Sequence, residues 1–229
     1  MSTVLVTGAG RGIGLATAKA FRGAGWKVLA VDLEFSEKEE KDTRQVKFDL
    51  QDLSAIPGLV ASLGEIDALV NNAGMQNALP YDKYPDAARQ KIIRINLEVP
   101  AELMRAVAPQ MIARKSGRIV NLASIASYQP HPDMWYGATK AGIASLTKSF
   151  ASYLGPHGVQ VNAVAPGPVD TELLRVVDAA RREKLLQQVY TRRVGKAEEI
   201  AAAILWLCTG APALVNGSIL DINDGTYSR

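Results

Sequence analysis

Short apolar runs alternate along this chain with longer segments of helical period, and few folds accommodate that order. The runs are rich in β-branched residues and end at Gly, Pro, Asn or Asp; they are Thr3–Thr7, Lys27–Asp32, Gln45–Phe48, Asp67–Asn71, Arg118–Ala123, Val159–Ala165 and Ser218–Ile222. The helical patterns include Gly14–Gly23, Pro85–Lys115, Trp135–Leu154 and Ala197–Leu207. This alternation predicts an α/β fold, a doubly wound parallel sheet with helices on both faces.

The bulk properties narrow the class of protein further. A chain of 229 residues can bury its core as one domain, so we expect a single domain over residues 1–229. Cys208 is the only cysteine, which fits a reducing compartment. No secretory signal precedes the first apolar run, and no run approaches the ~20 residues that span a bilayer. We expect a cytoplasmic protein that binds no membrane, no metal and, at a net charge of +3, no nucleic acid.

A glycine-rich turn joins the first predicted strand to the first predicted helix. Gly8, Gly12 and Gly14 follow the pattern G-x-x-x-G-x-G, whereas the commoner G-x-G-x-x-G does not fit. Glycines at such a turn let the backbone approach a pyrophosphate, and the N–H groups at the helix start bind the anion. The position of the turn predicts a Rossmann-type dinucleotide site; a glycine turn without a ligand is the alternative.

The second predicted strand ends at Asp32, which lies 18 residues after Gly14. An acid about 20 residues after the glycines binds the adenosine ribose diol of NAD and repels the 2′-phosphate of NADP. Glu34 adds to that repulsion, whereas Arg11 in the glycine turn favours a 2′-phosphate. We therefore expect NAD, with NADP as the less favoured cofactor.

Two further segments carry polar groups that suit an enzyme site. The sequence Asn71-Asn72-Ala73-Gly74 directly follows the fourth predicted strand; it suits a close approach to a cofactor and equally an Asn-Gly turn. Tyr136 and Lys140 open a helical pattern one turn apart on one face. An ammonium near a phenol, together with an oxidised nicotinamide, favours the phenolate, so we expect the two to lower the pKa of Tyr136.

Together these segments resemble the short-chain dehydrogenase/reductase family. The matching pieces span nearly the whole chain in the family's order: Thr7–Gly14, Asn71–Gly74, Asn96, Ser124, Tyr136 with Lys140, and Pro166-Gly167-Pro168-Val169-Asp170-Thr171. Each motif is weak alone, and the set is specific. The resemblance implies an oxidoreductase that moves a hydride between NAD(H) and a secondary alcohol or ketone.

The resemblance also implies four catalytic residues. Tyr136 would exchange a proton with the substrate oxygen, and Lys140 would lower the pKa of that phenol and hold the nicotinamide ribose. Ser124 would hydrogen-bond the substrate oxygen and stabilise its developing charge. Asn96 would anchor a water that links Lys140 to solvent.

The same resemblance implies the contacts to the dinucleotide. Thr171 would bind the nicotinamide carboxamide, Asp49 the adenine amine, and Asn72 and Gly74 would line the adenosine side. The full set of implied cofactor positions is Gly8, Arg11, Gly12, Ile13, Gly14, Asp32, Asp49, Leu50, Asn72, Ala73, Gly74, Tyr136, Lys140, Pro166, Gly167, Val169 and Thr171.

The chain departs from the family pattern at three places. Ser124 precedes Tyr136 by 12 residues, one fewer than usual, so Ser127 is the alternative catalytic serine. The C-terminal strand is followed by Asn223-Asp224-Gly225, with one glycine where the family often has two, which bears on subunit contacts. The tail beyond is short and leaves little material to cover the site.

The substrate is not selected by the sequence. The expected walls are Met75–Tyr81, Ile125–Trp135 and a lid at about 171–193, with the side chains Tyr128, Gln129, His131, Met134, Trp135 and Arg175. His131 is a loop residue or a substrate contact, and Arg175 is solvated or pairs with a carboxylate. Small or cyclic alcohols, polyols and β-ketoacyl thioesters all remain open.

The competing functions are a 3-oxoacyl thioester reductase that uses NADPH, a sugar-nucleotide epimerase or dehydratase, and a non-catalytic NAD(H)-binding sensor. The chain is short for the epimerase's added substrate domain, and a sensor usually lacks one catalytic member. The resemblance further implies a homotetramer or homodimer built through the helices of 101–114 and 135–154 and the C-terminal strand.

Overall fold

The computed structural model describes residues 1–77, 79–175 and 179–228. Its centre is a seven-stranded sheet in the order β3-β2-β1-β4-β5-β6-β7. The strands are β1 (Thr3–Thr7), β2 (Lys27–Asp32), β3 (Thr43–Lys47), β4 (Ala68–Asn71), β5 (Gly117–Leu122), β6 (Val159–Pro166) and β7 (Ile219–Ile222). Every neighbouring pair is parallel, so the expected doubly wound parallel sheet is confirmed.

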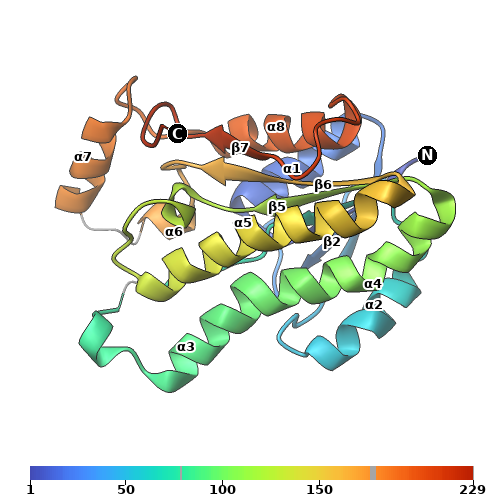
Figure 1. The fold of residues 1–229 in the computed structure, drawn as a ribbon, viewed down its shortest axis with the longest axis horizontal. Coiled ribbons are helices and arrows are strands. Elements are labelled where there is room, and N and C mark those ends of the chain that lie inside the picture. The colour runs from blue at the N-terminus through green and yellow to red at the C-terminus, as the bar shows by residue number, and fades with distance from the viewer. Residues whose placement is uncertain (78, 176–178, 229) are drawn as a thin grey trace.

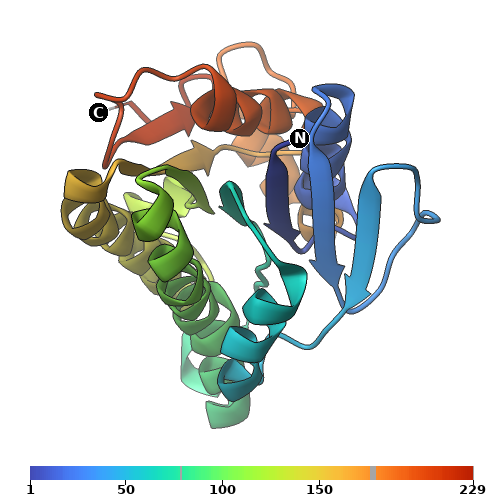
Figure 2. The ribbon, with the colours of Figure 1, turned by 90° about the vertical axis from the view of Figure 1, so that its right-hand side faces the viewer.

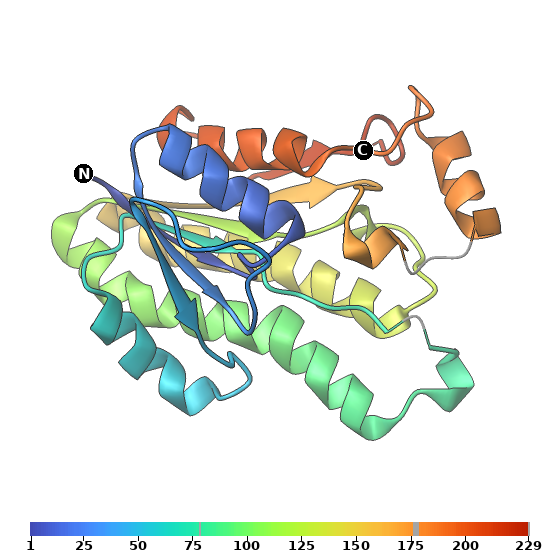
Figure 3. The same cartoon turned by 180° about the vertical axis from the view of Figure 1, so that it is seen from behind.

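Helices cover both faces of this sheet (Figures 1 and 2). One face carries α2 (Ile56–Leu63), α4 (Val99–Arg114) and α5 (Met134–Leu154), whose apolar side chains pack with Leu5, Leu69 and Ile119 of the strands. The other face carries α1 (Gly12–Gly23) and α8 (Ala197–Thr209), which lie side by side in front of the sheet in Figure 3. Each layer of helices buries its own apolar cluster against the sheet. This follows because the strands are apolar on both faces and each helix has one apolar face that must be covered.

The burial of the strands follows their place in the sheet. All eight residues of β6 are buried, whereas β3 and β7 at the two edges are half-exposed. The prediction began β3 at Gln45, but pairing with β2 begins at Thr43, because an edge strand tolerates polar side chains that do not look like a strand.

The predicted helical segment Pro85–Lys115 is a run of three elements. It consists of α3 (Asp86–Ile93), the π-helical turn η3 (Arg94–Glu98) and α4. In an α-helix the N–H of residue 100 would donate to the carbonyl of Asn96, and Pro100 has no N–H. The chain instead forms a wider turn, in which the N–H of Val99 donates to the carbonyl of Arg94.

Shorter elements connect these layers. They are the 3₁₀ turns η1 (Leu53–Ala55), η2 (Tyr81–Lys83), η4 (Ile125–Ser127) and η5 (Gly155–His157), and the helices α6 (Glu172–Arg175) and α7 (Ala179–Gln188). Helix α7 stands beyond the carboxyl ends of the strands, at the left of Figure 1. Among the described residues, no helix is long and apolar enough to cross a membrane. The same residues hold no group of three or more His, Cys, Asp or Glu placed to bind a metal.

Candidate active site

The sequence-predicted site residues follow the strands at one edge of the sheet. The glycine turn follows β1, Asp32 ends β2, Asn72 follows β4, Ser124 follows β5 and Pro166 ends β6. Since all strands are parallel, their carboxyl ends meet at this edge, where ligands of open α/β sheets bind.

A cavity of about 470 Å³ opens at this edge. Ten of the predicted residues line it: Ile13, Asn72, Gly74, Ser124, Tyr136, Lys140, Pro166, Gly167, Val169 and Thr171. The other predicted residues do not line the cavity: Gly8, Arg11, Gly12, Gly14, Asp32, Asp49, Leu50, Ala73 and Asn96. Its volume suits a small ligand with part of a cofactor.

The glycine turn is packed too closely for side chains. A Cβ on Gly14 would lie 2.0 Å from the carbonyl oxygen of Gly8, and a Cβ on Gly8, which has a φ of +63°, would lie 2.8 Å from the Cα of Ala73. The amide of Asn72 donates to the carbonyls of Thr7 and Gly8, each at 2.9 Å. Asn72 therefore supports the turn as well as lining the cavity.

Helix α1 begins directly at this turn with an open N-terminus. Its N-cap residue, Arg11, makes no side-chain cap, and the first turn holds no acid. The first N–H groups of a helix have no partner within it, and the helix dipole favours an anion there. The turn therefore fits a pyrophosphate.

The two predicted acids, at the end of β2 and after β3, accept hydrogen bonds from backbone N–H groups. Asp32 accepts hydrogen bonds from the N–H of Gly10 at 2.8 Å and of Leu33 at 2.7 Å. Asp49 is exposed and accepts from the N–H of Gln51 at 2.9 Å, while its neighbour Leu50 is buried. Asp32 thus places a carboxylate directly beside the glycine turn.

Ser124, Tyr136 and Lys140 meet in the cavity. Tyr136 and Lys140 lie one turn apart on α5, with the Lys140 ammonium 5.6 Å from the centre of the Tyr136 ring. Ser124 contacts the Tyr136 hydroxyl by a hydrogen bond and caps η4 by accepting from the N–H of Ala126. Ser127 does not line the cavity, so the geometry favours Ser124 over that alternative.

The surroundings of Tyr136 do not lower its pKa. Burial, and to a lesser extent the charge of Asp133, raise it above the ordinary value, and the hydrogen bond with Ser124 opposes that rise. The Lys140 ammonium instead donates to the carbonyl of Leu122 at 2.6 Å, and burial lowers its own pKa to about 8. Desolvation thus has the largest effect on both groups, and the lowering of the Tyr136 pKa expected from Lys140 together with an oxidised nicotinamide stays a prediction.

Asn96 lies fully buried in the π-helical turn behind the cavity. Its amide accepts from the N–H of Met75 at 2.9 Å and donates to the carbonyl of Met75 at 2.8 Å and to the hydroxyl of Thr139 at 3.2 Å. These bonds hold the chain that follows Gly74 against α5. π-Helical turns occur often at functional sites, and this one places Asn96 close to Lys140, since both lie near Gly74.

The cavity walls agree in part with the expected ones. Gln76, Gln129, His131 and Gln188 contribute polar groups, and the His131 ring lies 4.8 Å from that of Tyr136. Tyr128, Met134 and Trp135 do not line it. The side chain of Arg175 and residues 176–178 of the expected lid lie outside the described residues.

The short C-terminal tail packs against the loop that follows β5. Tyr227 stacks on Tyr128 of the loop that follows β5, with ring centres 5.3 Å apart. Asp224, in the left-handed conformation at φ +47°, accepts hydrogen bonds from Thr191 at the end of the expected lid. Asp224 thus ties Thr191, at the end of the expected lid, to the C-terminal turn.

Sequence reasoning missed Asp133, which is fully buried beside Tyr136. An aspartate directly before a helical pattern is an N-cap signal, and that signal was available here.

The chain is similar to proteins of known family. Residues 8–227 match the family model described as enoyl-(acyl carrier protein) reductase. The chain is 34% identical to 2-dehydro-3-deoxy-D-gluconate 5-dehydrogenase of Bacillus subtilis (99% of this chain, 95% of the relative). It is 32% identical to the 3-oxoacyl-(acyl-carrier-protein) reductase FabG of Escherichia coli (97% and 96%).

A solved structure from Agrobacterium tumefaciens, provisionally described as a 2-deoxy-D-gluconate 3-dehydrogenase with bound NADP, superposes with a TM-score of 0.91. It is 29% identical, and the alignment covers 100% of this chain and 97% of that one.

Proposed function

The chain belongs to the short-chain dehydrogenase/reductase family and is an NAD(P)-dependent oxidoreductase acting on a CH–OH or keto group; on that premise we propose that Ser124, Tyr136 and Lys140 carry the reaction and that NAD is the preferred cofactor. The observation that carries the proposal is the meeting of these three side chains in one cavity at the carboxyl edge of the sheet.

Tyr136 is the proposed proton donor and acceptor. In ketone reduction its phenol gives a proton to the carbonyl oxygen, and in alcohol oxidation its phenolate takes the proton of the hydroxyl group. The raised pKa keeps Tyr136 protonated at neutral pH, which suits reduction. Oxidation is therefore expected to become faster as the pH rises and Tyr136 loses its proton.

Ser124 and Lys140 support this proton transfer. The Ser124 hydroxyl contacts the Tyr136 hydroxyl, so one substrate oxygen can bond to both, and charge that develops on that oxygen is stabilised. The Lys140 ammonium donates to the carbonyl of Leu122 and lies beside the place proposed for the nicotinamide ribose. Asn96 fixes the Met75 backbone behind Lys140.

The residues present fit a nicotinamide dinucleotide. The open N-terminus of α1 fits the pyrophosphate, and the Asp32 carboxylate fits the ribose diol. Thr171 lines the cavity and lies close to Gly12, where a Cβ would be 3.4 Å from the Thr171 methyl group, and we expect the carboxamide there. Hydride is supplied or accepted by this cofactor when it is bound.

The preference for NAD rests on Asp32. Its carboxylate lies beside the glycine turn, where a 2′-phosphate would meet a like charge. Arg11 and the NADP bound to the solved relative favour the opposite choice. Asp32 decides in our proposal, because the backbone N–H groups of Gly10 and Leu33 fix its position.

Two substrate classes follow from the relatives. A sugar acid or polyol is favoured by the gluconate dehydrogenases, and by Gln76, Gln129 and Gln188, whose amides can pair with several hydroxyl groups. A 3-oxoacyl thioester reduced with NADPH is the alternative, favoured by the FabG relatives.

We also propose a domain organisation, a compartment and an oligomeric state for the chain. We assign residues 1–229 to one domain with a lid at about 171–193, and expect a cytoplasmic homotetramer or homodimer. Tyr153 of α5 and Trp206 of α8 are exposed large side chains that suit subunit contacts, and light scattering at micromolar protein tests this.

The deciding experiment follows NADH and NADPH formation over a panel of secondary alcohols and sugar acids, with Tyr136→Phe beside the wild type. We expect turnover with NAD in the wild type, a loss of about 10²–10⁴-fold in the variant, and unchanged NADH binding. Full activity in the variant contradicts the assignment. Tight NADH binding without turnover on any substrate favours the non-catalytic sensor.

A further inference from the structure

Asp133 determines where helix α5 begins. It is the N-cap residue, its side chain is fully buried, and its carboxylate accepts from the N–H of Tyr136 at 3.1 Å. The N–H groups of a helix's first turn have no acceptor within the helix, so an N-cap side chain fixes its start. The position of Tyr136 therefore depends on this carboxylate.

The same carboxylate also binds the segment that contains Asn77 and Tyr84. It accepts from the N–H of Asn77 at 2.7 Å and from the hydroxyl of Tyr84 at 3.2 Å. The amide of Asn77 donates in turn to the Tyr84 hydroxyl at 2.8 Å. Asn77 directly follows Gln76, which lines the cavity, so the hydrogen bonds of Asp133 also hold a segment of the cavity wall.

We propose that Asp133 is a positioning residue for Tyr136, one that locks the first turn of α5 to Asn77 and Tyr84 and holds a buried negative charge at the backbone N–H of Tyr136. This inference rests on the proposed role of Tyr136 in proton transfer.

The charge of Asp133 acts among few other titratable groups. Lys140 lies 5.6 Å from the Tyr136 ring centre and is bonded to Leu122, and the His131 ring lies 4.8 Å away with its Nδ1 accepting from the N–H of Asp133. Tyr84 bonds Asp133 itself, and Arg89 of α3 lies over the ring of Trp135 instead.

A second negative charge in this buried site is costly, so the charge of Asp133 favours the protonated form of Tyr136. Its charge adds to the larger effect of burial in raising the pKa of the phenol. A protonated Tyr136 is the form that donates to a ketone oxygen. Asp133 therefore raises the pH at which Tyr136 changes from a proton donor to a proton acceptor.

The test titrates Tyr136 directly and needs no substrate. Tyrosinate absorbance is followed in the wild type and in Tyr136→Phe, and the difference isolates Tyr136 among the tyrosines. The same pair is then measured with Asp133→Asn, which keeps the size of the side chain and one acceptor for the helix cap. We expect Tyr136 to lose its proton at a lower pH in the Asn background, because the negative charge that opposes the phenolate is gone.

Tyr84→Phe is the matched control, because it removes one contact of Asp133 and keeps the charge. Its Tyr136 midpoint is expected to stay at the wild-type value. If Asp133→Asn does not fold by near-UV circular dichroism, Asp133→Ser, which keeps a capping hydroxyl, takes its place.

The proposal is overturned if the titration midpoint of Tyr136 in Asp133→Asn is the same as in the wild type or higher. It is also overturned if Tyr136 gives no tyrosinate signal in Asp133→Asn below the pH at which that variant unfolds. Loss of folding in both Asp133 variants also overturns it, because a purely structural role then suffices. A wild type that titrates as expected but turns over no substrate contradicts the proposed function and not this inference.

Discussion

The ammonium nitrogen of Lys140 donates to the carbonyl oxygen of Leu122 at 2.6 Å, and this bond joins helix α5 to the end of strand β5 beside Tyr136. The carbonyl is one partner for a charge that burial has removed from water. Burial therefore lowers the pKa of Lys140 to about 8.

Lys140→Met is expected to change how stability depends on pH. The pKa of the unfolded lysine is about 10.4, so between that pH and about 8 the unfolded chain holds the extra proton. The contribution of the wild-type lysine to the free energy of unfolding is present above about pH 10.4 and is lost as the pH falls to 8, a change of about 3 kcal/mol.

Urea unfolding of the wild type and Lys140→Met at pH 7.5 and pH 10 measures this difference. The wild type should gain stability relative to the variant at the higher pH. A difference between the two proteins that is the same at both pH values contradicts a buried, proton-releasing Lys140.

Gly14→Ala is expected to damage both folding and cofactor binding. The new Cβ would lie 2.0 Å from the carbonyl of Gly8 and 2.5 Å from the amide of Asn72, so the turn that faces the pyrophosphate must move. We expect a loss of about 1–3 kcal/mol in stability and at least tenfold weaker NADH binding by fluorescence titration.

Gly58→Ala is the matched control for that substitution. Gly58 lies in helix α2, and a Cβ there meets nothing within 4 Å, so alanine should leave NADH binding intact and stabilise by about 0.5 kcal/mol. Equal effects of the two substitutions would show that crowding at the turn is not the cause.

The sequence predicted the strands best where the sheet is buried. The run Val159–Ala165 is apolar almost throughout because β6 lies in the sheet interior with helices on both sides, and its prediction was one residue short. The start of β3 was missed by two residues, since Thr43 and Arg44 on an edge strand carry no apolar signal.

The site was predictable where residues follow strands and not where distant segments meet. Ser124, Tyr136 and Lys140 line one cavity, as residues that follow the end of β5 and open α5 can, because these two elements fix them locally. Asp133 acts through Asn77 and Tyr84, which lie about fifty residues earlier, and spacing cannot reveal such contacts. The spacing reveals the neighbouring lysine but not the burial of the phenol, which raises the pKa of Tyr136.

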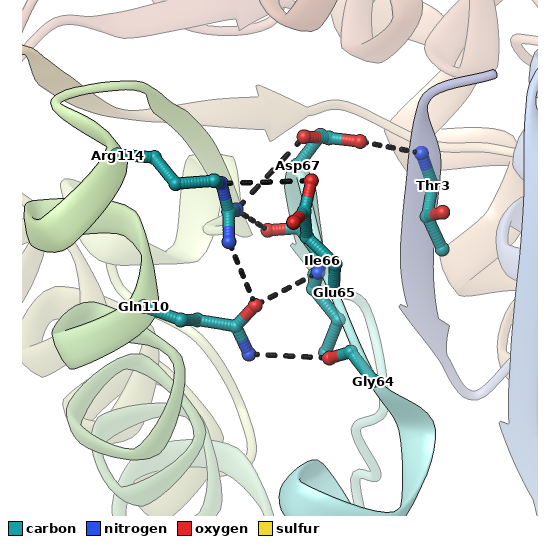
Figure 4. A network of polar contacts seen from close by, with 7 residues as sticks. All are labelled: Thr3, Gly64, Glu65, Ile66, Asp67, Gln110 and Arg114. Carbon is teal, nitrogen blue, oxygen red and sulfur yellow. Dashed lines mark hydrogen bonds and ion pairs between the residues drawn. The ribbon is translucent and has the colours of Figure 1, made fainter.

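Arg114→Met is expected to loosen the edge of the sheet opposite the active site. The guanidinium of Arg114 donates to the carbonyl of Ile66 at 2.6 Å and lies 3.8 Å from the carboxylate of Glu65 and 3.9 Å from that of Asp67. Figure 4 shows these contacts. Gln110 accepts from both Arg114 and the N–H of Ile66, so α4 is tied to the start of β4. We expect a loss of about 1–2 kcal/mol in urea unfolding, with turnover unchanged.

The comparison for Arg114 is Arg105→Met on the same helix. Arg105 pairs with Glu102, but its side chain is 68% exposed, and surface pairs contribute little. Its removal should change stability by less than about 0.5 kcal/mol. A loss as large as that of Arg114→Met would refute the special role of the Arg114 network.

Asp32→Asn tests whether charge at the end of β2 selects the cofactor. The amide removes the negative charge and leaves one acceptor for the two N–H groups of Gly10 and Leu33. A 2′-phosphate then meets no carboxylate, and Arg11 remains to attract it, so the ratio of kcat/KM for NAD to that for NADP should fall at least tenfold. Glu34→Gln, an exposed neighbour, should change this ratio much less. If the wild type already prefers NADP, or if Asp32→Asn leaves the ratio unchanged, the carboxylate does not select NAD and Arg11 becomes the residue that decides.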